Sequence, residues 1–328
     1  MALNSYKKAG YVMSSLIVLE QMVIIFLLIG TGVILYRKKM LSEPTSKQLS
    51  GLIVNVTNPA LLICSAFDEG PKVSLSELGT ALGCYAVVYA ILIAVGFLAP
   101  WILRIPKKSH YAYRMLSVFG NVGFIGIPLA SAVLGTGSLI FVAIYNLLYN
   151  LLIYTFGITV LQKAANQETS DSDTSVAKPS KLHMLINAGT ISAALTVLFY
   201  LGDFPVPVII SSTLSYAGRA TTLLSMLVLG VSVAQISLRE TFSNPKLYAF
   251  TLIRQILVPI GCVLLFGIFI KHTLILNTLL LMVAVPAANM PLMLAKQLDM
   301  DTGDISQGII LTTILSLVTV PVVCAFLR

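Results

Sequence analysis

Residues 119–128 read Phe-Gly-Asn-Val-Gly-Phe-Ile-Gly-Ile-Pro, and residues 283–291 read Val-Ala-Val-Pro-Ala-Ala-Asn-Met-Pro. Each stretch places an Asn and at least one Pro inside a run that is otherwise apolar enough to lie in a bilayer. Proline lacks a backbone N–H and its ring clashes with the preceding turn, so each stretch predicts a helix that is interrupted within the membrane. Lipid offers no hydrogen-bond partner to an opened backbone. The two interruptions are therefore expected to cross near the bilayer midplane and to enclose a polar site.

The composition is that of an integral membrane protein. Hydrophobic residues make up 57% of the 328 residues and charged residues 10%, whereas soluble domains carry roughly 25% charged residues. Ten spans of about 20 apolar residues are predicted near residues 15–36, 46–67, 78–101, 111–135, 138–161, 184–202, 207–235, 247–270, 274–297 and 304–327. Because these ten spans occupy nearly the whole chain, they predict an all-α membrane fold without a soluble catalytic domain.

The basic residues predict the orientation of these spans. Fifteen of the 21 Lys and Arg residues lie in alternate loops, and the positive-inside rule makes those loops cytoplasmic. Both termini are then extracytoplasmic, and the polar segment 162–181 is cytoplasmic. The formal charge of +8 is accounted for by topology, so nucleic-acid binding is not expected.

A repeat relates the two halves of the chain. An offset of 163 residues places Pro44 on Pro207 and Pro128 on Pro291. The shared offset predicts a duplicated unit of five helices. An odd number of spans per unit inverts the second copy, which is how many secondary transporters build a site at the membrane midplane.

The predicted domain organisation follows from this repeat. Residues 1–161 form the first five-helix repeat, residues 162–181 a cytoplasmic polar linker, and residues 182–328 the second, inverted repeat. The interrupted fourth and ninth helices are then symmetry mates.

The two interruptions supply most of the candidate site. The half-helices that follow them are expected to begin at Pro128 and Pro291, and to present free N–H groups and positive dipole ends that favour a small anion. The candidate substrate-binding residues in these stretches are Asn121, Gly123, Gly126, Pro128, Asn289, Met290 and Pro291.

Other polar residues within the spans complete the prediction. Asn58, and Thr222 in the corresponding stretch of the second repeat, are expected to close the site from the opposite side. Arg219 is a candidate anion ligand, or a structural partner of Glu20, or a side chain that reaches out to the membrane surface. Asn146 either lines the cavity or bonds between helices.

Two further charged positions have simpler interpretations. Glu20 is the candidate for proton coupling, the alternative being a solvated carboxylate at the outer rim. Arg254 and Gln255 follow the cytoplasmic entrance of their span, and are predicted to anchor it at the interface. The sequence holds no phosphate loop, Ser/His/Asp set or zinc motif, so neither an enzyme nor a cofactor or metal site is expected.

Four stretches together resemble the auxin efflux carrier family, which includes plant auxin exporters and the bacterial malonate and malate permeases. They read Gly-Asn-Val-Gly-Phe-Ile-Gly-Ile-Pro-Leu (120–129), Val-Pro-Ala-Ala-Asn-Met-Pro-Leu-Met-Leu-Ala-Lys (285–296), Asn-Pro-Ala-Leu (58–61) and Met-Leu-Val-Leu-Gly-Val-Ser (226–232). The similarity spans essentially the whole chain, and the short linker is more like that of prokaryotic members.

The resemblance implies ten helices in two inverted repeats, as in bile-acid transporters and antiporters. It implies that helices 1, 2, 6 and 7 form a dimerising scaffold, and that helices 3 to 5 and 8 to 10 move as an elevator. Pro128 and Pro291 would be the crossover prolines, and Asn121 the residue that contacts a carboxylate. Arg219 departs from the small residue expected there.

The sequence therefore predicts a secondary transporter of small mono- or dicarboxylates, present in the cell membrane as a homodimer. Its expected partners are the organic anion, the lipid bilayer and a coupled proton. A sodium-coupled organic anion symporter of the bile-acid class and a membrane sensor that binds without transporting are the alternatives.

Overall fold

The computed structural model describes residues 15–67, 73–168, 187–202, 206–235, 241–298 and 300–325. Within these ranges the regular structure is helical, apart from an isolated antiparallel bridge between Gly120 and Ala287. Seven helical segments in the same ranges are long and apolar enough to cross a membrane, and three apolar helices are shorter. The prediction of an all-α integral membrane protein is confirmed at this level.

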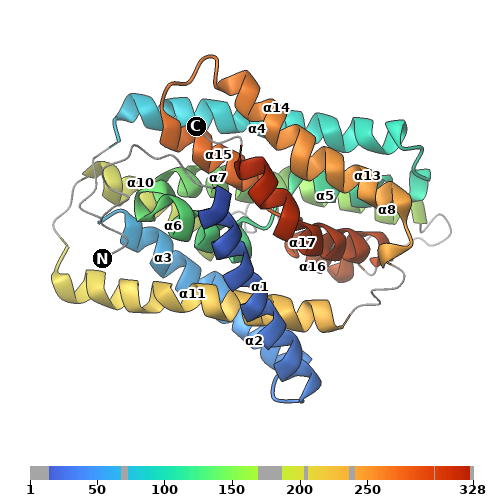
Figure 1. The fold of residues 1–328 in the computed structure, drawn as a ribbon, viewed down its shortest axis with the longest axis horizontal. Helices are drawn as coiled ribbons and strands as arrows, with labels where there is room; N and C mark the ends of the chain where they lie inside the picture. The colour runs from blue at the N-terminus through green and yellow to red at the C-terminus, as the bar shows by residue number, and fades with distance from the viewer. Residues whose placement is uncertain are drawn as a thin grey trace.

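Figure 1 shows the order of the helices along the chain, with short 3₁₀ and π-helical turns labelled η in the text. Those of the first half are α1 (Ser15–Arg37), α2 (Glu43–Leu52), η2 (Ile53–Thr57), α3 (Asn58–Ser65), α4 (Leu75–Ile102), η3 (Lys107–Ser109), α5 (His110–Val118), η4 (Val122–Gly126), α6 (Ile127–Leu134), η5 (Thr136–Ser138), α7 (Leu139–Leu152), η6 (Ile153–Gly157) and α8 (Ile158–Glu168). Those of the second half are α10 (Ala188–Gly202), α11 (Val208–Ala234), α13 (Pro245–Leu252), η7 (Ile253–Leu257), α14 (Val258–Phe266), α15 (Thr273–Ala284), α16 (Met290–Gln297) and α17 (Gly303–Cys324).

The first residues of the predicted linker at 162–181 are helical. Helix α8 continues to Glu168, because its last turns are built from Lys, Ala, Gln and Glu, which favour helix despite their polarity. The remainder of the predicted linker, from residue 169, lies outside the described residues.

Local sequence signals start several helices. Ser42 caps α2 by accepting from the Thr45 N–H at 3.3 Å, with Pro44 in the first turn. Ser74 and Glu77 form a reciprocal capping box at the start of α4. Proline is tolerated in the first turn because its missing N–H has no partner there in any case, so these motifs place the helix starts.

Three π-helical turns each precede a proline by two residues. They are η2 before Pro59, η4 before Pro128 and η7 before Pro259. A proline inside a helix removes one backbone donor and collides with the carbonyl four residues earlier. A wider turn moves that carbonyl aside, so the helix continues through the proline instead of ending.

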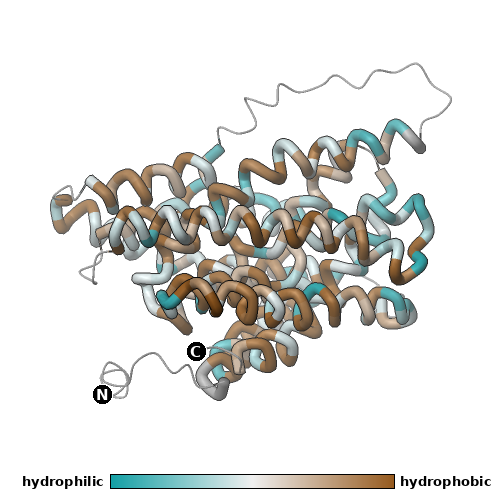
Figure 2. The backbone as a smooth tube through the Cα atoms, turned by 90° about the horizontal axis from the view of Figure 1, so that it is seen from above, coloured by the Kyte–Doolittle hydropathy of each residue, from teal (hydrophilic) through white to brown (hydrophobic). Residues whose placement is uncertain are grey.

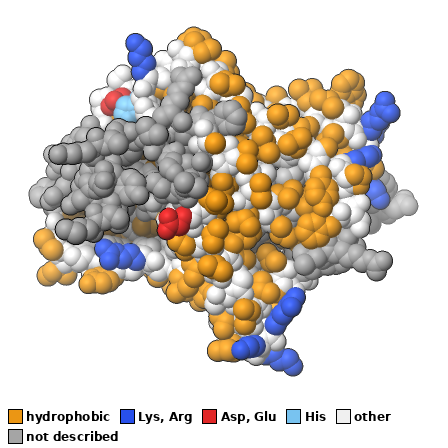
Figure 3. Space-filling view, viewed as in Figure 1, with side chains coloured by type: hydrophobic (Ala, Val, Ile, Leu, Met, Phe, Trp, Pro, Cys, Tyr) orange, Lys and Arg blue, Asp and Glu red, His pale blue; other side chains and the backbone are white. Residues whose placement is uncertain are grey.

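The helices pack with apolar surface outward, as a bilayer requires. Helix α11 contacts α1, α2, η2 and α3, while α5 contacts α4 and α17. Figure 2 shows hydrophobic residues along most of each helix, with hydrophilic residues gathered mainly near the turns. Hydrophobic side chains also spread across the face shown in Figure 3, where most Lys and Arg residues lie toward the edges.

The crossing of α1 and α11 depends on two glycines. A Cβ at Gly230 would lie 2.2 Å from the Ile29 carbonyl oxygen, and one at Gly32 would lie 2.4 Å from the Leu227 carbonyl oxygen. At both positions the Cβ would meet backbone atoms of the facing helix, which cannot move aside as a flexible side chain does. Small residues therefore set the distance between these helices, as is common in membrane proteins.

We expect Gly32→Ala to destabilise the protein, whereas Gly30→Ala on the same helix is tolerated, because a Cβ at Gly30 meets nothing within 4 Å. Overpacking of this kind costs about 1–3 kcal/mol. Thermal unfolding of the purified protein in detergent measures the difference. Equal Tm values for the two variants contradict the proposed contact.

Candidate functional site

Two extended stretches cross at the centre of the fold, and we call residues 119–121 and 285–289 together the crossing. Helix α5 ends at Val118 and α15 ends at Ala284, as the sequence predicts for interrupted helices. The Asn121 N–H donates to the Pro286 carbonyl at 2.7 Å, and the Ala288 N–H donates to the Phe119 carbonyl at 2.9 Å. Each interruption therefore satisfies backbone groups that the other leaves open.

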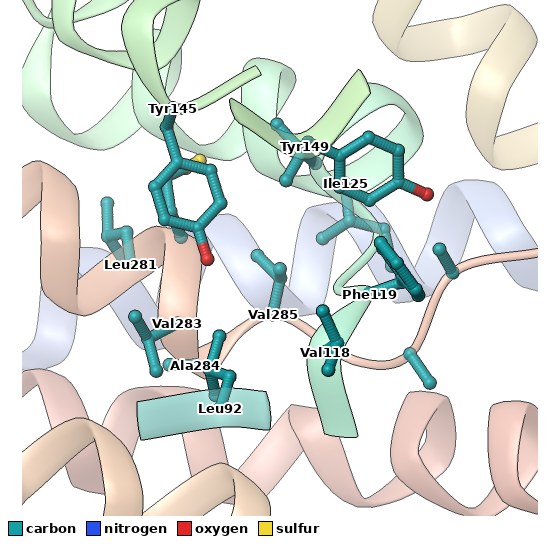
Figure 4. Close-up of a cluster of buried hydrophobic side chains, with 14 of the residues drawn as sticks. Leu92, Val118, Phe119, Ile125, Tyr145, Tyr149, Leu281, Val283, Ala284 and Val285 are labelled. Atoms are coloured by element: carbon teal, nitrogen blue, oxygen red, sulfur yellow. The ribbon is translucent and has the colours of Figure 1, made fainter. Parts of the chain in front are cut away.

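Buried side chains from several helices surround the crossing. The Ala287 N–H donates to Thr312 Oγ1 of α17 at 3.1 Å, and the Phe119 ring meets Tyr149 edge-on at 5.5 Å between centroids. Figure 4 shows the apolar part of this environment, including Leu92, Val118, Phe119, Ile125, Tyr145, Tyr149, Leu281, Val283, Ala284 and Val285.

The first half-helix begins at Val122, so the prediction that it begins at Pro128 is wrong. Asn121 occupies the N-cap, where its Oδ1 accepts from the Phe124 N–H at 3.1 Å. Pro128 lies further along the same helical run, because the π turn η4 accommodates it. The interruption is thus made by Gly120 and Asn121 rather than by the proline.

The Asn121 side chain is 2% exposed, and its Nδ2 has no hydrogen-bond partner among the described residues. Buried polar atoms are normally bonded. An amide whose oxygen is fixed by a helix N-terminus therefore presents a free donor beside the crossing.

The second half-helix, α16, begins as the sequence predicts. Asn289 precedes it and its carbonyl accepts from the Met293 N–H at 3.1 Å, while Pro291 lies in the first turn. Asn289 and Met290 are half-buried and Pro291 is buried. Asn121 and Asn289 thus hold equivalent places, each directly before a half-helix.

Asn58 approaches the first half-helix from α3. Its Nδ2 donates to the Gly123 carbonyl at 3.1 Å, and a Cβ at Gly123 would lie 3.2 Å from that nitrogen. Gly126 faces α15, since a Cβ there would meet Met282 Sδ at 3.2 Å. The two glycines let η4 approach its neighbours on both sides.

Several hydroxyl and amide groups are buried where α11 faces η2 and α3. Thr221 and Ser225 of α11 are fully buried, and Thr222 between them is half-buried. Buried polar atoms without a partner in the described part of the chain include Thr57 Oγ1, Asn58 Oδ1, Thr221 Oγ1 and Ser225 Oγ. The face of η2 and α3 next to α11 is therefore polar, and Asn58 and Thr222 stay predicted members of the site.

Arg254 and Gln255 are buried at the crossing, and the prediction that they anchor an interface is wrong. Arg254 is 1% exposed and Gln255 0%. Arg254 Nε donates to the Ser117 carbonyl at 2.6 Å and Nη1 to the Val283 carbonyl. Gln255 Nε2 donates to the Thr312 carbonyl at 3.0 Å.

Pro259 is the sequence signal that bears on Arg254. The π turn that precedes this proline contains Arg254, and π turns are frequent at functional sites. Counting residues from the end of a span predicts only how deep Arg254 lies in the membrane. It does not predict its partners, which are carbonyls of two other helices.

Arg219, Glu20 and Asn146 make no hydrogen bond or ion pair with the described residues of the crossing. Arg219 and Glu20 are both exposed, and no ion pair within 4.0 Å joins them, which removes the predicted structural pair within one copy. The Asn146 carbonyl accepts from Asn150 Nδ2 of the same helix at 2.9 Å. Asn150 in turn lies against Gly189 of α10.

A cavity of about 390 Å³ lies away from the crossing, between the ends of α5, α13 and α17. Its lining includes Lys108, Lys246, Asp301 and Asp304, so it carries charges of both signs. Such a mixed lining suits an aqueous entrance better than a selective anion site.

Interrupted helices that pair at a buried crossing, within an all-helical apolar chain, define a polytopic membrane protein with an internal polar site. Comparison with known proteins agrees. Residues 17–324 match the family described as membrane transport protein. The chain therefore belongs to this family, which is the auxin efflux carrier family expected from the sequence, and it is a transporter rather than an enzyme.

Two archaeal relatives match this chain over nearly their whole length. An uncharacterized transporter of Methanocaldococcus jannaschii is 23% identical over 312 residues, which is 93% of this chain and 97% of the relative. An uncharacterized transporter of Methanothermobacter thermautotrophicus is 23% identical over 304 residues, which is 92% of this chain and 96% of the relative.

The hydroxyl of Thr312 is expected to stabilise the crossing. Thr312→Val leaves the buried Ala287 N–H without an acceptor, which costs about 1–3 kcal/mol. Thr313→Val is the matched control, because Thr313 is also buried but bonds only within its own helix, to the Ile309 carbonyl. A Tm that falls equally in both variants rules out this role for Thr312.

Proposed function

We propose that the protein is a secondary active transporter of small organic anions, namely mono- or dicarboxylates, that works by alternating access. The observation that carries this proposal is the crossing, where Asn121 and Asn289 stand directly before two half-helices. We place the protein in the cell membrane with both termini extracytoplasmic, as the distribution of basic residues indicates.

Electrostatics favours a negatively charged substrate at this point. The first amides of a helix have no partner within it, and each helix N-terminus carries roughly half a positive charge. Two such ends directed at one region supply about one positive charge, together with the free Nδ2 of Asn121. A carboxylate matches both that charge and those donors.

The ten helical segments support two inverted five-helix repeats. α5, an interruption and η4–α6 are matched in the second half by α15, an interruption and α16. The helix starts pair Asn121 with Asn289, whereas the sequence offset pairs Pro128 with Pro291. We attribute the difference to a few extra residues near the second interruption. The proposed order of helices in the two repeats is unchanged, but the residue-by-residue alignment shifts near the interruptions.

An elevator mechanism fits the way in which the helices pack. Helix α11 contacts α1, α2 and α3, and α3 contacts α10, which groups the proposed scaffold; α10 also packs on α7 and α1 on α17, across the proposed boundary. α4, α5, α7, α14, α15 and α17 contact one another around the crossing. Asn58 bridges the two groups through its bond to Gly123. Cysteine accessibility at Gly123, measured with and without substrate, tests whether this boundary moves.

Arg219 supports a homodimer. It is exposed near the middle of α11, where a guanidinium facing lipid is costly. A second copy that covers this face relieves the cost, and the exposed carboxylate of Glu20 offers an opposite charge. Light scattering of the purified protein in detergent checks this, because a mass of one copy contradicts it. Glu20 is also the proposed residue for proton coupling, and transport driven by a pH gradient tests this directly.

Asn121→Ala is expected to lower carboxylate flux in proteoliposomes by at least about tenfold, because it removes a charge-assisted hydrogen bond. Asn121→Asp keeps the N-cap acceptor but places a negative charge at the proposed anion site, so it should fold and yet not transport. Asn55→Ala is the matched control, since Asn55 is exposed and its amide bonds only to the Gly51 carbonyl at 2.8 Å.

A carboxylate flux equal to that of the native protein in either Asn121 variant contradicts the site assignment. Saturable carboxylate binding without flux through the native protein favours the sensor instead. A requirement for sodium favours the symporter of the bile-acid class.

A further inference from the structure

Arg254 joins the C-terminal ends of α5 and α15, the helices that precede the two interruptions. It is the largest fully buried side chain among the described residues, and it comes from η7, which belongs to neither interrupted helix. Its Nε donates to Ser117 O in the last turn of α5, and its Nη1 donates to Val283 O in the last turn of α15. One guanidinium thus bonds to two helix C-termini.

The remaining nitrogen points to the crossing itself. Nη2 has no partner among the described residues, and a Cβ at Gly120 would lie 3.2 Å from it. Gly120 forms the bridge with Ala287. The guanidinium therefore reaches the backbone pair that joins the two interruptions.

The charges at this point balance. Each helix C-terminus carries roughly half a negative charge, so the two ends together carry about −1, and a guanidinium is permanently +1. No carboxylate lies within ion-pair distance of Arg254 in the part of the chain that the structure describes. Its counter-charge is therefore the pair of helix ends.

We propose that Arg254 is a resident cation, which occupies at the crossing the place that a bound monovalent cation would otherwise fill. It is a positioning residue: it holds the two C-terminal ends together and neutralises them, so that only the two N-terminal ends need a charge from outside. Resting on the transport function proposed above, this makes the crossing complete with one substrate carboxylate and without sodium.

The geometry suits arginine and no other cationic side chain. The fork of the guanidinium reaches carbonyls on two different helices at once, whereas a lysine ammonium is a single compact charge. Arg114 provides a contrast on α5. It is half-buried, and its guanidinium lies over the Phe97 ring at 4.2 Å from the centroid, away from both helix ends.

The experiment restores the missing ion chemically. Arg254→Ala removes the guanidinium but keeps the carbonyls of Ser117 and Val283, and is expected to lower the Tm by about 10 °C. Millimolar guanidinium chloride should then raise the Tm of this variant saturably, by about 3 °C or more. Choline chloride at equal ionic strength should not. The native protein and Arg114→Ala should show no such rise.

A second pair of variants separates charge from hydrogen bonding, and serves if Arg254→Ala does not fold. Arg254→Lys keeps the positive charge and Arg254→Gln keeps only donors, so the lysine variant should melt at the higher temperature. A glutamine variant as stable as the lysine variant overturns the proposal. So does an Arg254→Ala variant that folds and does not respond to guanidinium.

Flux measurements distinguish this proposal from the proposed function. Native carboxylate flux that is unchanged when choline replaces sodium supports the resident cation. Flux that requires sodium overturns it, although transport itself stands. Rescue of the Tm by guanidinium in a protein that moves no carboxylate supports the role of Arg254 and overturns transport.

Discussion

The structure depends on the backbone hydrogen bonds that two interrupted helices make with each other. An opened backbone inside a bilayer must find partners within the protein, since an unsatisfied group costs several kcal/mol there. Here the partner of each interruption is the other, through Asn121 with Pro286 and Ala288 with Phe119. Neither break is stable alone, so the two halves of the chain are held together where their helices are least regular.

The pairing of the two interruptions also brings partial charges together. Two helix N-termini and two helix C-termini come to one buried region, and their partial charges are of opposite sign. Asn121 marks the positive ends, and Arg254 neutralises the negative ends. In the function proposed here, a similar pair of breaks thereby becomes an asymmetric site that takes an anion on one side. The asymmetry comes from a side chain that the other half of the chain does not duplicate.

Hydropathy and proline were enough to predict an all-helical membrane protein with interrupted helices, because lipid leaves an apolar chain little other choice. The same reasoning placed the first half-helix too late, at Pro128, because it treated proline as a break when the π turn η4 absorbs it. It also missed Arg254, whose partners lie on α5 and α15. Which residues meet depends on how the helices cross, and one sequence does not contain that information locally.

The strengths of the contacts favour motion between groups rather than within the crossing. Backbone bonds, Thr312, Gln255 and Arg254 join the two interruptions to α17 and η7. Separating them would leave several buried donors and a charge unpaired, at 1–3 kcal/mol for each neutral group and more for the guanidinium. The proposed scaffold bonds to the other group through Asn58, which donates to the Gly123 carbonyl, and through the Tyr200 hydroxyl, which accepts from the Val73 N–H just before α4. A neutral hydrogen bond contributes about 1 kcal/mol. A crossing that moves as one rigid body past the scaffold therefore breaks weak contacts and keeps the strong ones, which is the condition that an elevator has to meet.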